Sequence, residues 1–174
     1  MAIRVIFLSR SNAARSQIAE YLLNKMGHGR FDAVSAGSMP APVNPLAIRV
    51  LEELKIDAQD AVSKPIECFE DDDFDFIICI CDDSSASCES IKPDCPTLPG
   101  RKSQGCWGFG RMPDGDADEA EVQQYLRGVR DQIANRLRIW MAAVDKSGRD
   151  TSHGMEVHRP EATGSGAQPA TGQG

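Results

Sequence analysis

The spacing of apolar residues along the chain predicts strands that alternate with helices. Short apolar runs bounded by polar residues predict strands at residues 3–8, 31–36 and 74–81. Apolar residues at helical spacing predict amphipathic helices over residues 16–26, from Asn44–Pro45 to Leu54, and from Glu119 to Val144. This alternation favours an α/β domain with a mostly parallel sheet.

The domain is expected to end before the end of the chain. The 174 residues are enough for one domain with a substantial core. From residue 146 onward, Gly, Ser, Thr, Pro and Ala dominate and no apolar periodicity remains. We therefore expect a domain over residues 1–145 and a disordered tail over residues 146–174. Residues 82–106 are expected to form a long connection, rich in Ser, Pro and Cys.

Charge and hydropathy exclude several classes of partner. The net charge of -7 argues against non-specific binding to nucleic acid, which needs a basic surface. The apolar runs are far shorter than the roughly 20 residues that cross a bilayer, and the N-terminus lacks the pattern of a signal peptide. We expect a cytoplasmic protein with no membrane partner, in which any anion site is a local feature.

One such local feature is the polar loop that joins the first predicted strand to the first helix. The N–H groups of such a loop can surround an anion, and the helix N-terminus adds its positive dipole. An arginine that closes the loop can hold two oxygens of a tetrahedral oxyanion. An ordinary turn with a surface arginine remains the alternative. The candidate anion-binding residues are Ser9, Arg10, Ser11, Asn12, Ala13, Ala14, Arg15 and Ser16.

The second chemical feature is a group of cysteines near the third predicted strand. Five of the six cysteines fall between residues 79 and 106. Cys79 and Cys81 share one face of that strand, and Cys79 is expected to be a small buried hydrophobe. No Cys-x2-Cys pair occurs, so we expect neither a metal site nor a cofactor. Because ligands bind at the carboxyl ends of parallel strands, Cys81 and the Ser9 loop are expected to meet.

Longer motifs identify a family. The stretch "VIFLSRSNAARSQIAEYL" resembles the phosphate loop of the low-molecular-weight tyrosine phosphatase fold. It is most similar to thiol-dependent arsenate reductases, whose loop reads Cys-x5-Arg followed by Ser-Gln-x-Ala-Glu. The resemblance continues in order through "SAG", "VNPLAIRVLEELKID", "FDFIICICDD", "CPTLPG", "CWGFGRMPDG" and "YLRGVRDQI", and covers roughly residues 3–140.

The resemblance implies a fold, a substrate class and a thiol relay. The implied fold is phosphatase-I-like: a single three-layer domain with a four-stranded, mostly parallel sheet and helices on both faces. Arsenate, phosphate or sulfate would be the bound oxyanion, and thioredoxin or glutaredoxin the reductant. In the thioredoxin-coupled branch, two further cysteines seven residues apart pass on the disulfide. Cys81 and Cys88 have that spacing, whereas Cys95 has the Cys-Pro context of the third cysteine. We prefer Cys88 and keep Cys95 as its rival.

Four positions depart from the family pattern. Ser9 stands where the family has its nucleophilic cysteine, Ala13 where a serine is common, Met112 where an aspartate precedes proline, and Cys106 where a histidine precedes tryptophan. Asp114 or Asp116 would be out of register as a substitute. Loop N–H groups ionise a thiol but not a hydroxyl, so Ser9 would need a general base. His28, His153 and His158 all lie far from the loop in the sequence.

Three functions therefore remain open. The chain is a diverged pseudo-enzyme that binds an oxyanion without thiol turnover, or an arsenate reductase whose nucleophilic cysteine was changed to Ser9. The third is a thiol redox or arsenite-binding switch through Cys81, Cys88 and Cys95, in which Cys68 and Cys106 are bystanders. The simultaneous changes at Ala13 and Met112 favour the first.

Overall fold

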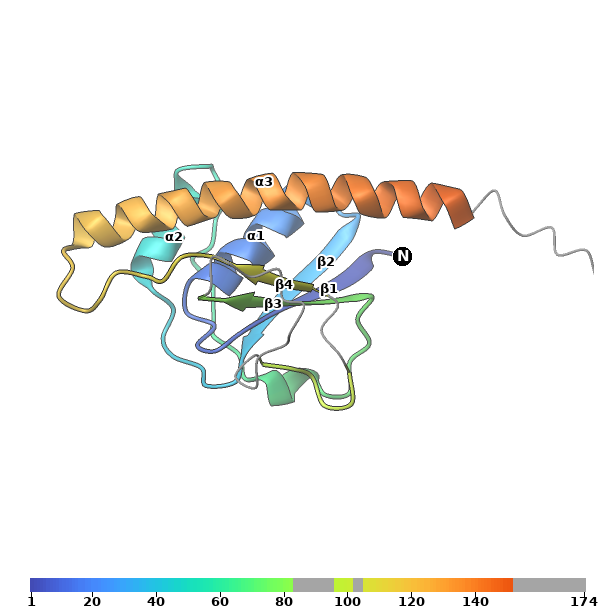
Figure 1. The fold of residues 1–174 in the computed structure, drawn as a ribbon, viewed down its shortest axis with the longest axis horizontal. Coiled ribbons are helices and arrows are strands. Elements are labelled where there is room, and N and C mark those ends of the chain that lie inside the picture. Colours follow the sequence, from blue (N-terminus) through green and yellow to red (C-terminus); the bar gives the residue numbers. More distant parts are fainter. Residues whose placement is uncertain (83–95, 102–104, 152–174) are drawn as a thin grey trace, which may run out of the picture. The chain divides into compact units, whose positions relative to one another are not determined.

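A four-stranded parallel sheet organises the fold. The computed structural model describes residues 1–82, 96–101 and 105–151. The strands stand in the order β2-β1-β3-β4 and every pair is parallel (Figure 1). The elements in chain order are β1 (Ile3–Ser9), α1 (Arg15–Gly27), β2 (Phe31–Gly37), α2 (Pro45–Glu52), the 3₁₀ helix η1 (Ile66–Phe69), β3 (Phe76–Cys81), β4 (Gly105–Gly108) and α3 (Glu119–Thr151). The predicted fold class is confirmed.

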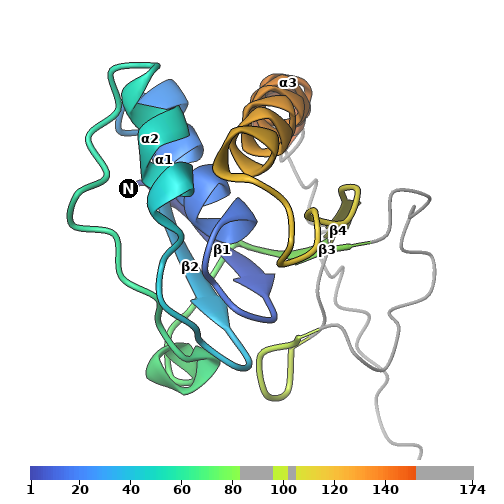
Figure 2. The same cartoon turned by 90° about the vertical axis from the view of Figure 1, so that its left-hand side faces the viewer.

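Alternate side chains of β1 pack on the two faces of this sheet. Phe7 lies 5.9 Å from Trp107 between ring centroids, and Trp107 lies 6.4 Å from Trp140 of α3. On the opposite face, a second apolar cluster contains Leu8, Ile66 of η1 and Leu98. Helices α1 and α2 and residues 119–140 of α3 gather on the first face (Figure 2). The sheet therefore separates two apolar layers, because successive side chains of a strand point to opposite faces of the sheet.

The sequence pattern gives no sign of strand β4, which begins inside the predicted connection at residues 82–106. β4 contains only four residues, with glycine at both ends, so it forms no apolar run. It pairs with β3 and places Cys106 opposite Cys79. The prediction of an unbroken connection is wrong at this end, because neighbouring backbone rather than local pattern makes Gly105–Gly108 a strand.

Helix α3 continues beyond its predicted end at Val144. It reaches Thr151, and the chain divides into two units, Met1–Trp140 and Met141–Gly174. Residues 152–174 lie outside the described residues, so a disordered tail there stays a prediction. Among the helices that the structure describes, none has the length and apolar character of a transmembrane segment.

A carboxylate at the end of α2 holds two arginines of α3. Glu53 accepts hydrogen bonds from Arg127 Nε at 2.9 Å and from Arg130 Nη1 at 2.7 Å. The buried Arg130 also donates to the carbonyl oxygen of Val50 at 2.8 Å. The hydrogen bonds from Arg127, with a further contribution from Arg130, lower the pKa of Glu53 from 4.5 to about 2. The charged carboxylate therefore stabilises the native packing of α2 against α3.

We expect Glu53→Gln to lower the free energy of unfolding at pH 7 by about 1 kcal/mol, because two ion pairs become hydrogen bonds from charged arginines to a neutral amide. A carboxylate whose pKa is lower in the native state than in the unfolded state stabilises the fold at pH values above its unfolded-state pKa. This stabilisation is lost as the pH falls through the native-state pKa. The deficit of the variant should therefore shrink between pH 4.5 and about 2. Denaturant unfolding across that range checks this, with the exposed Glu67→Gln as control. A deficit that does not change with pH would contradict it.

Candidate functional site

The loop between β1 and α1 is held tightly against the end of β2. Ser9 pairs with Gly37 in the sheet register. A Cβ atom added to Gly37 would lie 2.8 Å from the Arg10 carbonyl oxygen and 3.0 Å from Asn12 N, so only glycine allows this approach. Asn12 has a φ of 49°, a left-handed conformation that asparagine tolerates better than most residues. The loop therefore turns sharply at Asn12 while it stays against the sheet.

The carbonyl groups of this loop are directed toward the chain that follows β2. The N–H groups of Ser38, Met39, Ala41 and Asn44 donate to the carbonyl oxygens of Ser9, Arg10, Ser11 and Ala13, at distances of 2.7–3.1 Å. Within the described residues, the N–H groups of Ser11, Ala13, Ala14 and Arg15 donate to no acceptor. A loop with occupied carbonyls and available N–H groups, at the start of a helix, has the character of an anion nest.

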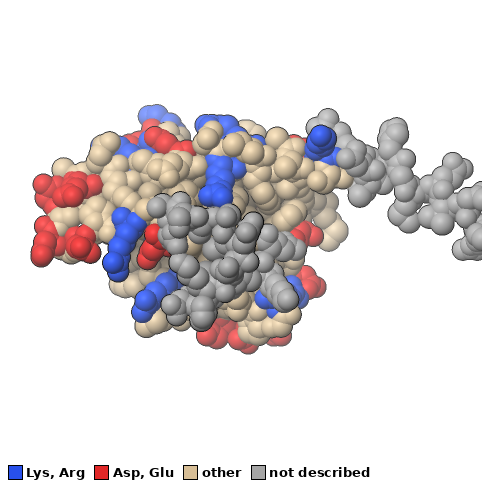
Figure 3. All heavy atoms as spheres, in the orientation of Figure 1, with Lys and Arg blue, Asp and Glu red and all other residues tan. Residues whose placement is uncertain are grey.

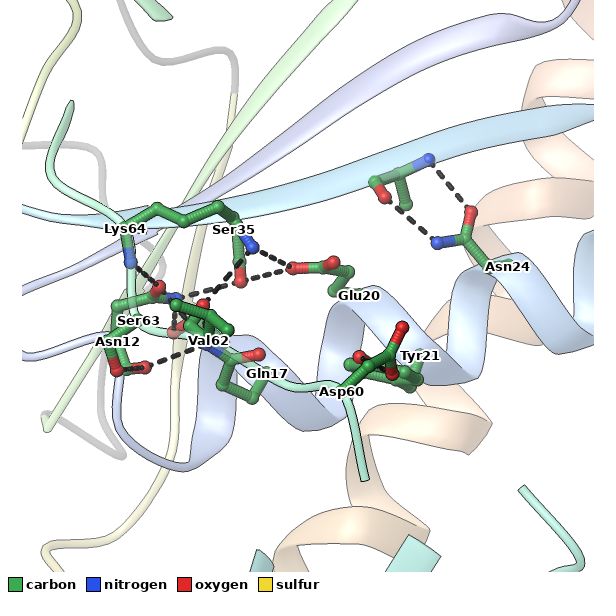
Figure 4. A network of polar contacts seen from close by, with 12 residues as sticks. Asn12, Gln17, Glu20, Tyr21, Asn24, Ser35, Asp60, Val62, Ser63 and Lys64 are labelled. Atoms are coloured by element: carbon green, nitrogen blue, oxygen red, sulfur yellow. Dashed lines mark hydrogen bonds and ion pairs between the residues drawn. The ribbon is translucent and has the colours of Figure 1, made fainter. Parts of the chain in front are cut away.

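The side chain of Asn12 fixes the conformation of the loop (Figure 4). Its Nδ2 donates to Ser16 Oγ at 2.9 Å and to Ser35 Oγ at 2.8 Å. Its Oδ1 accepts from the N–H of Lys64 at 2.9 Å and from Gln17 Nε2 at 3.1 Å. Asn12 therefore joins the loop to β2, to α1 and to the segment before η1.

Behind Asn12, a second row of polar side chains extends the network. Ser35 Oγ donates to Glu20 Oε2 at 2.5 Å, and Lys64 Nζ lies 3.3 Å from the same carboxylate oxygen. Ser63 Oγ donates to the Asn12 carbonyl oxygen at 2.7 Å. Sequence reasoning missed Ser35, Ser63 and Lys64 as supports of the loop, because only the fold brings their segments to Asn12.

Ser9 lies at the base of the loop and is 8% exposed. Its Oγ accepts a hydrogen bond from Asn12 N at 3.0 Å and shares one with Ser16 Oγ at 2.8 Å. Neither partner is a base. His28 stands at the opposite end of α1 from the loop, and His153 and His158 lie outside the described residues. Among the described residues, no hydrogen-bond partner of the Ser9 hydroxyl can remove its proton.

Arg15 joins the loop to the end of β3. Its side chain is 17% exposed and forms an ion pair with Asp82. Its Nη1 also donates to the Cys81 carbonyl oxygen at 3.3 Å. Burial raises the pKa of Tyr125, Arg15 opposes that effect, and Asp82 adds to it, so these three polar groups lie together. The predicted meeting of the loop with the segment after β3 is therefore present in the structure.

Two of the cysteines near the loop have neighbouring sulfur atoms. Cys81 is half-buried, and its Sγ lies 3.5 Å from the Sγ of Cys106, a disulfide-bonded residue of β4. Cys106 is therefore a spatial neighbour of the candidate relay cysteine, and its role as a bystander stays a prediction. Cys79 is buried at 1% exposure, as expected of a small hydrophobe. Cys88 and Cys95 lie outside the described residues.

The segment between β4 and α3 contains Met112 and the two aspartates that follow it. Met112 is half-buried, while Asp114 and Asp116 are exposed. On the face drawn in Figure 3, lysines and arginines are scattered among acidic side chains. This agrees with an anion site built locally from backbone N–H groups and Arg15.

Comparisons with known proteins give consistent matches. Residues 4–97 match the family model described as "Low molecular weight phosphotyrosine protein phosphatase". A glutaredoxin arsenate reductase of Synechocystis sp. is 32% identical over 133 residues, which cover 76% of this chain and 94% of the relative.

Solved structures give the same result. A structure described as an arsenate reductase in the phosphate binding state matches with a TM-score of 0.62 and 28% identity, over 81% of this chain and 98% of that one. The thioredoxin-dependent arsenate reductase Cg_ArsC1' of Corynebacterium glutamicum matches with a TM-score of 0.56 and 26% identity, over 84% of this chain and 63% of that one.

Proposed function

Because the chain belongs to the low molecular weight phosphotyrosine protein phosphatase family and has arsenate reductase homologues, we propose that it binds a tetrahedral oxyanion in the loop from Ser9 to Ser16. The proposed ligand is arsenate or phosphate. The N–H groups of the loop and the Arg15 guanidinium would surround its oxygens.

One observation carries this proposal. The carbonyl groups of the loop are occupied by the segment after β2, whereas several of its N–H groups have no acceptor among the described residues. Unpaired N–H groups on a half-buried loop are costly unless an anion or water accepts from them. The phosphate binding state of a homologous reductase supports the choice of a tetrahedral oxyanion.

We propose further that this chain does not carry out thiol-based turnover. Ser9 occupies the position of the family's nucleophilic cysteine, and its hydroxyl contacts only Asn12 N and Ser16 Oγ among the described residues. A hydroxyl has a much higher pKa than a thiol, and N–H dipoles alone do not ionise it. The changes at Ala13 and Met112 support divergence of the native protein rather than a single engineered Cys-to-Ser change.

Titration calorimetry tests the proposal directly. Sodium phosphate and sodium arsenate, each added to the full chain at pH 7.5, should give saturable binding heats. Assays with arsenate and either thioredoxin or glutaredoxin should give no arsenite above background. The absence of any binding heat would refute the anion site. Arsenite formation by the unmodified chain would refute the lack of turnover.

A second candidate function is thiol exchange at Cys81. The Cys81 Sγ lies 3.5 Å from the Cys106 Sγ, and Cys68 and Cys81 are not disulfide-bonded. A Cys81 thiolate that attacks a disulfide forms one S–S bond and releases the other sulfur as a thiolate. Thioredoxin or glutaredoxin is the proposed partner class, and the cytoplasm the proposed compartment. The thioredoxin-dependent homologue supports this choice of partner.

A further inference from the structure

The Arg15 side chain already has a carboxylate partner at the mouth of the loop. Asp82, the first residue after β3, forms an ion pair with one terminal nitrogen of Arg15. The other terminal nitrogen donates to the Cys81 carbonyl oxygen. A guanidinium has five N–H donors in one plane, so donors remain for an oxyanion while Asp82 stays bound.

An oxyanion held by Arg15 would therefore have Asp82 as a neighbour. Two oxyanions that share a planar guanidinium lie side by side, and their oxygens repel unless one of them carries a proton. Hydrogen phosphate and hydrogen arsenate keep one hydroxyl at neutral pH, which can donate to a carboxylate. Sulfate carries no proton and offers only acceptors.

We propose that Asp82 is a specificity-determining residue, which favours oxyanions that carry a proton and disfavours sulfate. This inference rests on the proposed function, because it assumes that the anion occupies the loop. The attraction for one ligand and the repulsion of its competitor come from the same carboxylate. Asp82 is 59% exposed, so solvent weakens both effects and the discrimination is moderate rather than absolute.

Neighbouring groups keep the carboxylate directed toward Arg15. Arg15 is mostly buried, and the hydrogen bond to the Cys81 carbonyl ties it to the residue just before Asp82. Tyr125 of α3 lies close enough to Arg15 and Asp82 for both charges to affect its pKa. The hydroxyl of Tyr125 itself donates to the Gly110 carbonyl oxygen. The guanidinium, carried by α1, and the carboxylate, at the end of β3, are thus held together by the ion pair and by the hydrogen bond to Cys81.

Titration calorimetry at pH 7.5 with sodium phosphate and sodium sulfate tests the proposal. The unmodified chain should bind phosphate at least about tenfold more tightly than sulfate. Asp82→Asn should bring the two affinities within about threefold, chiefly by a gain in affinity for sulfate. Asp82→Ala should behave in the same way, and sodium arsenate should follow phosphate. Asp71→Asn, which removes the same charge from an exposed position before β3, should keep the original ratio.

The outcomes separate the two proposals. A ratio that does not change in Asp82→Asn overturns the role of Asp82. An equal gain for both anions also overturns it, because Asp82 would then only neutralise Arg15. If the unmodified chain binds neither anion, the proposed function itself fails. If it binds both anions equally, the anion site stands and the specificity role is refuted.

Discussion

Arg15→Ala should weaken the binding of phosphate and arsenate by about 100-fold or more. The guanidinium is the cation that closes the loop, and its side chain is only 17% exposed. Hydrogen bonds to charged groups contribute about 1.5–3 kcal/mol each, and a bidentate contact has two of them. A loss of about 3 kcal/mol corresponds to roughly two factors of ten in the dissociation constant. Calorimetry with sodium phosphate measures it.

Two further variants make this test specific. Arg15→Lys should recover only part of the affinity, because an ammonium does not bind two oxygens in one plane. Arg10→Ala removes the same charge from an exposed side chain of the same loop and should change the affinity by no more than a few-fold. Thermal unfolding confirms that each variant is folded. Wild-type affinity in Arg15→Ala, or an equal loss in Arg10→Ala, would mean that the anion is not held at Arg15.

The sequence predicts those helices and strands whose apolar residues recur at the spacing of a helix or form a continuous apolar run. β1, β2 and β3 contain apolar runs, and the amphipathic spacing of α1 to α3 marks each helix; Asn44 caps α2 at its predicted start. β4 has no such run. Its residues become a strand because β3 offers them hydrogen-bonding groups, with Trp107 opposite Ile80. Tertiary pairing of this kind leaves no local signal in four residues.

The same distinction applies to the site. Strand, polar loop and helix follow one another in the sequence, so the loop from Ser9 to Arg15 could be located there. The residues that stabilise it come from separate segments: Ser35 on β2, and Ser63 and Lys64 before η1. The rule for parallel sheets indicates only that the end of β3 lies near the loop. It does not show that Asp82 and Arg15 form an ion pair, because side-chain partners depend on the complete packing.

Ser9→Cys should create a thiol with a strongly lowered pKa. The Asn12 N–H and the Ser16 hydroxyl, which now contact Ser9 Oγ at 3.0 and 2.8 Å, would both donate to a thiolate. The nearby N-terminus of α1 adds a favourable dipole. Cysteines in such surroundings have pKa values of about 3.5–7.5, compared with about 8.5 for an ordinary thiol.

Alkylation by iodoacetamide at pH 6.5 measures this effect without any enzymatic assay. The new thiol should react at least about tenfold faster than Cys68, an exposed thiol of the same chain. Sodium phosphate should slow the reaction of the new thiol and leave Cys68 unchanged, since the anion would occupy the same loop. Peptide mass spectrometry assigns each site, and the unmodified chain shows the background at Cys68 and Cys81. A rate equal to that of Cys68, with no protection by phosphate, would mean that the loop does not stabilise negative charge at position 9. Such a result would refute the proposed anion site, and it would show that a thiol at position 9 is not activated in this chain.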